Sequence, residues 1–364
     1  MIREGRIGTF ETVMILVFPI LGKIYLSYAS GIIKENLSAA WLAVLIGCLA
    51  AALMFIPLAA LLRRFPGEDL IGIARQSLGP FPGGLVIGLV VLFIFFSTAT
   101  TLRQIGETVI GTALPQVPLL LMIAAFAVLM ALTGRWGLEA IARVASFITP
   151  YLLIGGTALL LMHLPNMKAD YLAPLWGPGP GRLALNGILR SSLMSELVLL
   201  GFIAPAVARK KIVPSGAYLI VIATIVLTGT MLIGQMIFPP SVGAENTFPF
   251  YEIARSIYWG RFYQRVEFLF ILVWIVMVML SLTVRFYFSI TAFAKIFKLP
   301  YYQPLIPLAA LATLGAALLF PDYATTVHWD NLIRGRWAWV PAFAAPALIY
   351  VIAVLRGKRG ERDA

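Results

Sequence analysis

Cysteine and histidine are nearly absent from this 364-residue chain. Cys48 is the single cysteine, which excludes a disulfide framework and a thiolate metal site. The two histidines, His163 and His328, stand far apart in the sequence. There is no HExxH pattern, no serine-nucleophile elbow and no pair of aspartates inside an apolar run, and all aspartates fall in expected loops or in the tail. We therefore expect neither an enzyme nor a resident metal or cofactor.

Charge is scarce as well: charged residues make up 12% of the chain, whereas 60% of it is hydrophobic. A soluble domain carries roughly twice that share of charge, so we expect an integral membrane protein. A helix needs about 20 apolar residues to cross a hydrocarbon layer of ~30 Å. Ten runs of this kind lie near 10–31, 39–62, 84–112, 117–133, 143–164, 184–207, 216–238, 264–291, 303–320 and 337–355. No linker separates them, so residues 1–364 are expected to form a single all-α transmembrane domain.

Acidic residues are the rarer charged type, 16 against 28 Lys and Arg, which gives a net charge of +12. The basic residues cluster at the ends of apolar runs rather than on one face or tail, so membrane sorting explains them better than nucleic-acid binding. The side of the membrane shared by both termini carries about twice as many of them as the side that includes Arg334 and Arg336. We expect both termini in the cytoplasm. The first run is expected to stay as a span, because it is long and nine others follow it.

The first run contains helix-breaking residues in "VFPILGKIYLSYASG". Pro19 removes a helix hydrogen bond and Gly22 loosens the backbone just before Lys23. Two interpretations are open: a proline kink with Lys23 snorkelling to the interface, or an unwound segment that faces a midplane cavity. Ten spans divide into five plus five, and transporters built from inverted repeats interrupt corresponding helices, here the first and the sixth.

The sixth run, "ILRSSLMSELVLLGF", is unusually polar. Ser191 and Ser195 are four residues apart, as are Ser192 and Glu196, so the two pairs lie on adjoining helix faces. Glu196 stands about 20 Å deep at helical rise, where a carboxylate must face protein or water. It is our strongest candidate for a functional residue, with a structural interhelical hydrogen bond as the alternative. Arg190, nearer the outer end, is expected to snorkel.

The third run reads "FFSTATTLRQIGETVIG". Thr98 and Thr101 lie toward the midplane and are candidate ligand contacts. Arg103 and Glu107 are four residues apart and are expected to pair on one helix face, either as a structural ion pair or as a gate over a binding pocket.

The eighth run places Ser281 and Arg285 on one face. Ser281 lies deep enough to offer its hydroxyl to a cation, while Arg285 is expected to snorkel to the cytoplasmic interface. The outer gap at 240–263 shows apolar residues at helical spacing, which predicts a surface helix over the extracellular mouth or an aromatic interface belt.

Four phrases together resemble a known family: "RRFPGEDLIGIARQSLG", "TLRQIGETVIGTALPQVP", "GLEAIARVASFITP" and "TFPFYEIARSIYWGRFYQRVEFLFILVWIV". In this order and spacing they are similar to the B subunits of bacterial spore germinant receptors, the GerAB or spore-germination permease family. That family is a branch of the amino acid, polyamine and organocation transporter superfamily. The most specific features are "TFP", the Arg265 and Glu267 pair, and Trp274.

The resemblance implies a LeuT-like fold of ten helices in two inverted repeats, with a small-molecule pocket between the broken first and sixth helices and the third and eighth. It also implies residence in the inner membrane of the spore, with a larger A-type subunit and a lipoprotein C-type subunit as partners. Gly22 matches the glycine of the first break, and Ser195 with Glu196 matches the small-plus-Glu motif of the sixth helix. Lys23 departs from the family pattern.

Two functions follow from these expectations. The first is a receptor subunit that binds a small germinant, an amino acid by family preference, and signals to its partners. The second is a proton-coupled or sodium-coupled amino-acid transporter that uses the same pocket. A structural scaffold with an occluded pocket is a third class, in which changes at Glu196 or Thr98 leave the response to germinant unchanged.

Overall fold

The computed structural model describes residues 5–23, 28–257 and 267–360. This part of the chain is helical, with one isolated β-bridge outside the helices. The α-helices are α1 (Thr9–Leu21), α2 (Ala29–Asn36), α3 (Ala40–Met54), α4 (Ile56–Arg64), α5 (Leu70–Leu78), α6 (Pro80–Thr112), α7 (Leu119–Gly134), α8 (Gly137–Leu161), α9 (Pro180–Leu189), α10 (Leu199–Ile203), α11 (Ile212–Ile237), α12 (Pro240–Glu245), α13 (Pro249–Arg255), α14 (Glu267–Ile296), α15 (Ile306–Leu318), α16 (Tyr323–Asp330) and α17 (Ala345–Leu355).

Each of the ten expected spans corresponds to an apolar helix or helical stretch. Within the described residues, seven stretches are long and apolar enough to cross a membrane: Ala29–Arg64, Pro80–Thr112, Gly137–Asn166, Pro180–Ala206, Ile212–Ile237, Glu267–Ile296 and Tyr323–Leu355. Three shorter apolar helices, Thr9–Leu21, Leu119–Gly134 and Gln303–Leu318, match the first, fourth and ninth runs. The expected surface helix at 240–263 is two short helices, α12 and α13, and its last residues lie outside the described part.

The last span begins earlier than its hydropathy predicts. Asp322 caps α16 by accepting a hydrogen bond from the backbone N–H of Thr325 at 2.7 Å, and this bond holds the pKa of the Asp322 carboxyl below its ordinary value. From Tyr323 the chain continues through two π-helical segments, Asn331–Trp337 and Val340–Ala344, into α17. A stretch expected to be an outer loop is therefore the first half of a membrane-length helix.

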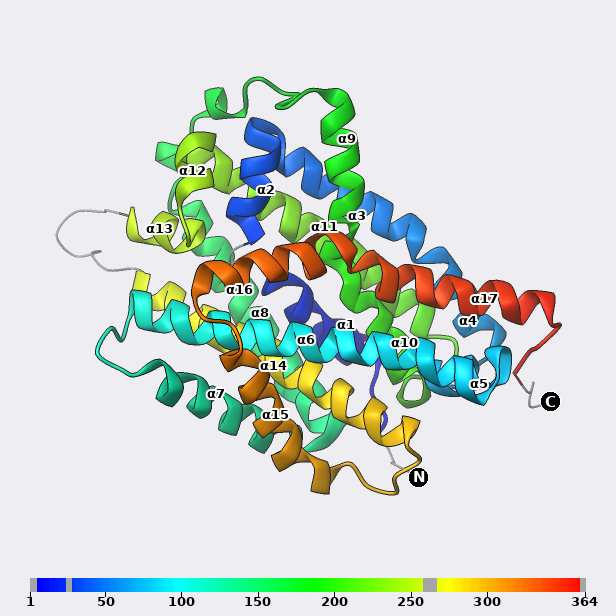
Figure 1. Ribbon diagram of the computed structural model, residues 1–364. Helices are drawn as coiled ribbons and strands as arrows, with labels where there is room; N and C mark the ends of the chain where they lie inside the picture. Colours follow the sequence, from blue (N-terminus) through cyan, green and yellow to red (C-terminus); the bar gives the residue numbers. More distant parts are fainter. Residues whose placement is uncertain (1–4, 24–27, 258–266, 361–364) are drawn as a thin grey trace.

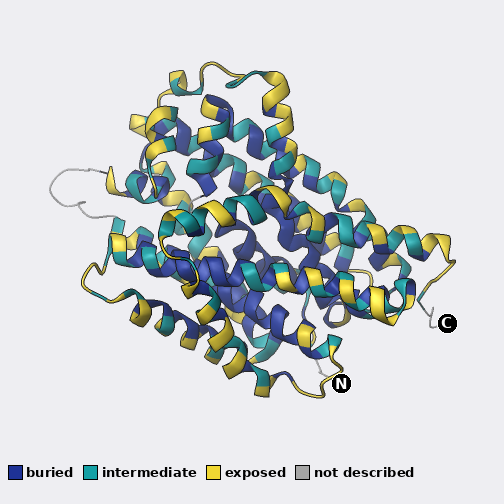
Figure 2. Cartoon of the chain, viewed as in Figure 1, coloured by how far each residue is buried: buried dark blue, intermediate teal, exposed yellow. Residues whose placement is uncertain are grey.

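Polar side chains lie in the interior and apolar side chains on the outer surface, as a bilayer requires. On α6, Leu85, Leu89 and Leu92 are exposed at helical spacing, whereas the threonines and Arg103 further along the helix are buried. Figure 2 shows buried residues gathered in the middle of the helical assembly and exposed residues along its rim. Because the exposed large side chains are mostly apolar, the outer surface suits lipid and the interior can hold polar groups.

The helices that carry the polar interior pack directly on one another. α6 lies along α14, and α1 packs against α8, α11 and α14 near the middle of the molecule (Figure 1). The start of the chain is tied to the end of the sixth span, because the Ile7 N–H donates to the Ala206 carbonyl at 2.9 Å in the bridge between Ile7 and Val207. The first and sixth spans are thus joined at the ends that precede α1 and follow α10.

Candidate functional site

The first span is interrupted where its proline and glycine predict. α1 ends at Leu21, and the next described helix begins at Ala29. The carbonyl of Pro19 is turned to Arg285, whose Nη2 donates to it at 3.2 Å. A Cβ atom on Gly22 would lie 3.0 Å from the Phe18 carbonyl and 3.7 Å from Ser281 Oγ. Only the contact within α1 is tight, since 3.7 Å is an ordinary van der Waals distance. α1 ends at Leu21, and Gly22 and Lys23 form a turn, which agrees with the predicted break of the first helix.

The sixth span is interrupted at its serine-rich stretch. Arg190–Val198 forms a 3₁₀ segment between α9 and α10, and Met194 leaves helical geometry with φ −102° and ψ 23°. Ser192 Oγ donates to the Gly335 carbonyl at 2.6 Å, and Ser195 Oγ donates to Glu196 Oε2 at 3.2 Å. The predicted break is confirmed, and its side chains are buried.

Lys23 joins the two interruptions. Its ammonium is fully buried, forms an ion pair with Glu196 and donates to Ser195 Oγ at 2.8 Å. It also lies 3.3 Å from the Ser192 carbonyl and 3.2 Å from the Leu193 carbonyl. Snorkelling of Lys23 is therefore wrong, because the open oxygens of the sixth span give the ammonium partners inside the protein.

Arg285 does not snorkel either, contrary to the expectation. Its side chain is 3% exposed and points into the protein, where Nε lies 3.6 Å from Glu196 Oε1. Nη1 donates to Thr101 Oγ1 at 2.7 Å and Nη2 donates to Ser281 Oγ at 2.5 Å. Hydroxyl and carbonyl oxygens accept hydrogen bonds from Nη1 and Nη2, while Nε is buried without a hydrogen-bond partner among the described residues and faces the Glu196 carboxylate. These partners hold inside the protein a guanidinium that we expected to reach water at the nearby helix end. The Ser281 hydroxyl, which we expected to face a cation, accepts a hydrogen bond from the Arg285 guanidinium in this structure.

Asp330 and Arg334 are site residues that the sequence interpretation placed in an outer loop. They are one turn apart, both about 1% exposed, and pair through Asp330 Oδ1 and Arg334 Nη1 at 2.9 Å. Arg334 Nη1 also donates to Thr101 Oγ1 at 2.9 Å, and Thr100 Oγ1 donates to Asp330 Oδ1 at 2.7 Å. They were missed because the last span was predicted to begin near residue 337. Their i, i+4 spacing and a possible N-cap at Asp322 are sequence signals that indicate an earlier helix start.

These groups form one connected set, which we name the central charge cluster: Lys23, Glu196, Arg285, Asp330 and Arg334. Thr101 connects its two halves by accepting hydrogen bonds from both arginines. Of the other predicted contacts, Thr98 is buried but donates only to the Ile94 carbonyl of its own helix, at 2.8 Å. Ser191 Oγ is buried without a hydrogen-bond partner among the described residues.

Further ion pairs lie away from the cluster. Arg103 Nε and Glu107 Oε1 are 2.5 Å apart on successive turns of α6, which confirms the predicted pairing. Arg190 was expected to snorkel and does not: its side chain is 4% exposed, and Nη2 lies 2.5 Å from Glu35 Oε2. Glu35 at the end of α2 supplies a partner within the protein, and Arg336 Nη2 contacts its second oxygen at 3.0 Å.

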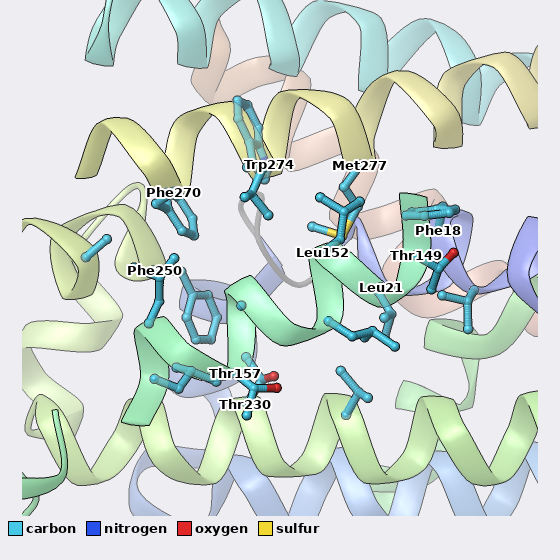
Figure 3. Close-up of a pocket in the computed structure, with 18 of the residues that line it drawn as sticks. Phe18, Leu21, Thr149, Leu152, Thr157, Thr230, Phe250, Phe270, Trp274 and Met277 are labelled. Atoms are coloured by element: carbon cyan, nitrogen blue, oxygen red, sulfur yellow. The ribbon is translucent and has the colours of Figure 1, made fainter. Parts of the chain in front are cut away.

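An apolar cavity of about 70 Å³ lies beside the end of α1. Its walls come from α1, α8, α11, α13 and α14, and Figure 3 shows the side chains of Phe18, Leu21, Trp274 and Met277 around it. Met277 precedes Ser281 by one turn of α14, about 6 Å along the helix axis. The cavity therefore lies one helical turn from Ser281, which accepts a hydrogen bond from Arg285 of the central charge cluster. Its size suits a small apolar group.

A family model described as "Spore germination protein" matches residues 6–321 of the chain. The chain belongs to the spore germination protein family. Among curated relatives, it is 21% identical over 364 residues to spore germination protein KB of Bacillus subtilis (strain 168), covering 96% of this chain and 95% of that protein. It is 24% identical over 371 residues to spore germination protein YndE of the same strain, covering 98% and 99%.

Solved structures similar to this family member are transporters, and the fold is LeuT-like. One is MhsT in complex with L-phenylalanine, with a TM-score of 0.71, 15% identity and coverage of 98% of this chain and 91% of that one. Another is Mhp1, a nucleobase-cation-symport-1 family transporter, in a closed conformation with bromovinylhydantoin bound, with a TM-score of 0.64, 16% identity and coverage of 97% and 90%. The expected fold is confirmed, and the chain is a multi-pass membrane protein of the germination family with the fold of these transporters.

The cluster of this germination protein can bind and orient charged groups. With Lys23 protonated it holds three cationic side chains and two carboxylates, so it carries an unmatched positive charge among the described residues. Asp330 Oδ2 and Arg334 Nη2 are buried without hydrogen-bond partners in the described part of the chain. Buried polar atoms are usually satisfied by protein, water or ligand. The chemistry favoured is recognition of a small polar molecule, and family and fold are those of permeases rather than enzymes.

Proposed function

We propose that this chain is the membrane-embedded subunit of a spore nutrient-germinant receptor. It binds a small germinant, an amino acid, between the two interrupted helices and signals to A-type and C-type partner subunits in the spore inner membrane. The observation that carries the proposal is the meeting of charged groups from both interrupted helices in the buried centre, beside an apolar cavity. An amino acid combines the same features, charged groups at one end and an apolar side chain at the other.

Charge balance favours a ligand that carries a carboxylate. Arg285 is linked to the cavity wall through α14, because Ser281, which accepts its hydrogen bond, is one turn from Met277 in that wall. A ligand carboxylate near Arg285 would offset the unmatched positive charge, and its side chain would enter the cavity. Glu196 and the open oxygens of the sixth span already hold Lys23, so the ligand is expected to bind chiefly through its carboxylate.

Signalling needs only that the ligand binds one conformation better than another. The two halves of the cluster belong to different elements, with Lys23 after α1, Glu196 in the sixth span and Asp330 and Arg334 in the last span. A ligand that pairs with one of these groups changes the contacts between spans. The partner subunits would sense that rearrangement.

Filling the cavity tests the proposal. Gly156 lines the cavity, and a Cβ atom there meets nothing within 4 Å, so Gly156→Leu inserts a side chain without a backbone clash. Gly229 on α11 is equally open but is absent from the lining, which makes Gly229→Leu the matched control. In spores that carry this chain with its partners, Gly156→Leu is expected to raise the half-maximal concentration of the active amino acid by about tenfold, which corresponds to ~1.4 kcal/mol of lost binding.

Spores are first screened against amino acids, sugars and nucleosides to find the active germinant. The control variant should respond within about twofold of the unmodified receptor, with equal protein levels in the membrane by immunoblot. Equal responses of both glycine variants, or activation by no amino acid in the panel, would contradict the proposal.

A coupled amino-acid transporter is the second candidate. The whole-chain structural similarity to two transporters favours it. Purified protein in liposomes, given a proton or sodium gradient and radiolabelled amino acids, distinguishes the two. A receptor subunit is expected to show no accumulation against the gradient, whereas concentrative uptake by the chain alone supports the transporter.

A further inference from the structure

We infer that Lys23 is a tethered monovalent cation, whose ammonium fills a cation site built by the interrupted sixth span. Within the described residues, Nζ has four oxygens around it, from residues 192–196: the carbonyls of Ser192 and Leu193 at 3.3 and 3.2 Å, Ser195 Oγ at 2.8 Å, and the Glu196 carboxylate. Carbonyls of an unwound helix, a hydroxyl and a carboxylate are the ligands that hard cations prefer, and discontinuous transporter helices coordinate Na⁺ in this way.

Contacts that do not involve Lys23 hold these oxygens in place. Ser192 Oγ donates to the Gly335 carbonyl at 2.6 Å on one side. On another side α3 lies directly against the segment, since a Cβ atom on Gly47 would be 2.7 Å from the carbonyl carbon of Arg190. The second carboxylate oxygen of Glu196 faces Arg285 Nε at 3.6 Å. The oxygen cage is therefore expected to persist when the Lys23 side chain is removed.

The position of Lys23 in the chain makes this cation different from a free ion. Lys23 follows Gly22 directly after α1, so its amine belongs to the first interruption while its ligands belong to the sixth. A free ion can leave the site alone, whereas this ammonium leaves only if the end of α1 moves. We therefore expect the protein to need no added cation to hold the two interrupted spans together. The inference concerns the purified chain and does not rest on germinant binding.

The test is thermal unfolding of the purified protein in detergent, in chloride salts of Na⁺, K⁺ or N-methyl-D-glucamine at equal ionic strength. The unmodified protein is expected to unfold at the same temperature in all three salts. Lys23→Ala is expected to unfold at a lower temperature in N-methyl-D-glucamine and to regain about 5–10 °C, saturably, with Na⁺ or K⁺. This is roughly the rise produced by a ligand at about 100 times its Kd. Whether Na⁺ or K⁺ restores more stability identifies the ion that fits the cage.

Two variants separate cation binding from packing. Lys23→Met keeps most of the side-chain volume without the charge, so it is expected to be destabilised equally in all three salts. Adding Glu196→Gln to Lys23→Ala removes the carboxylate and is expected to abolish the response to Na⁺ and K⁺.

Three outcomes would overturn the inference. The first is an unmodified protein that itself gains stability from Na⁺ or K⁺ over N-methyl-D-glucamine. The second is a folded Lys23→Ala protein that responds to neither ion. The third is failure to recover both Lys23→Ala and the smaller change Lys23→Ser in any salt, because a site that accepts a free cation predicts rescue.

Discussion

The central charge cluster and the Arg103–Glu107 pair use the same helix, α6, in opposite ways. The pair forms between successive turns of that helix, and its side chains are 5% and 15% exposed. The cluster meets α6 at Ser97, Thr100 and Thr101, and its charged members come from the first, sixth, eighth and last spans. Loss of the pair leaves α6 and its neighbours in place, whereas loss of a cluster member leaves buried charges unmatched in several spans at once. Buried ion pairs therefore differ in their expected contribution to stability, which depends on how many helices each pair connects.

The largest effect is expected from Glu196→Gln. The change leaves Lys23 and Arg285 facing a neutral amide in the protein interior, and an unpaired buried charge costs about 3–5 kcal/mol. Thermal unfolding in detergent should show a large loss of stability. Glu107→Gln is the control from the same comparison, and similar losses in both variants would contradict the distinction drawn between cluster and pair.

Removing both partners of the ion pair sharpens the comparison. The double variant Lys23→Met, Glu196→Gln no longer buries the ammonium opposite an amide, so its loss of stability should be smaller than the sum of the single losses by about 2 kcal/mol. A double-mutant cycle measured by unfolding of the four proteins gives this coupling. Strict additivity would show that Lys23 and Glu196 do not stabilise each other.

Thr101→Val tests the connection between the halves of the cluster. The hydroxyl accepts hydrogen bonds from Arg285 at 2.7 Å and Arg334 at 2.9 Å, so the nearly isosteric valine removes one acceptor from each buried guanidinium. Each Nη1 keeps a second acceptor, the Ser97 carbonyl for Arg285 and Asp330 Oδ1 for Arg334. We expect a loss of about 1–3 kcal/mol. Thr98→Val, three residues earlier, removes only a bond within the same helix and should lose clearly less. Equal losses at the two positions would mean that Thr101 does not link the arginines.

The smallest effect is expected from Glu107→Gln itself. Its partner Arg103 keeps a second acceptor, the Pro321 carbonyl at 3.2 Å. Since Glu107 is also partly solvated, the loss should be about 1 kcal/mol or less and should shrink with added salt. Unfolding temperatures at low and high salt measure both features. A loss of stability as large as that of Glu196→Gln would show that the Arg103–Glu107 pair is as important for the stability of the fold as the cluster is.

The sequence predicted those features that depend on residues near one another in the chain. The breaks in the first and sixth spans follow from Pro19, Gly22 and a serine-rich stretch, and the Arg103–Glu107 pair follows from its spacing. Contacts between residues of different spans could not be predicted from the sequence, because the depth of a residue in its span does not determine which face of the helix packs against another helix. Arg190 and Arg285 were assigned to water by their distance from helix ends, yet acidic groups on other elements hold them inside.

Asp330 and Arg334 were missed for a different reason. The hydropathy of the last span rises only near residue 337, so the polar turns before it resemble a loop. Helical structure there depends on the Asp322 cap and on partners from α6, Thr100 and Thr101, and these are tertiary contacts. Two of the five members of the charge cluster consequently lie in a segment that apolar periodicity alone does not reveal.

The bond between Ile7 and Ala206 has a mechanical consequence. It fastens the residues before α1 to those after α10, at 2.9 Å, while Lys23 fastens the far end of α1 to the sixth span. α1 is thus held to the sixth span at both of its ends, so we expect the two to move together rather than α1 alone. Any opening on that side of the membrane must either break the bond at Ile7 or carry both half-helices together.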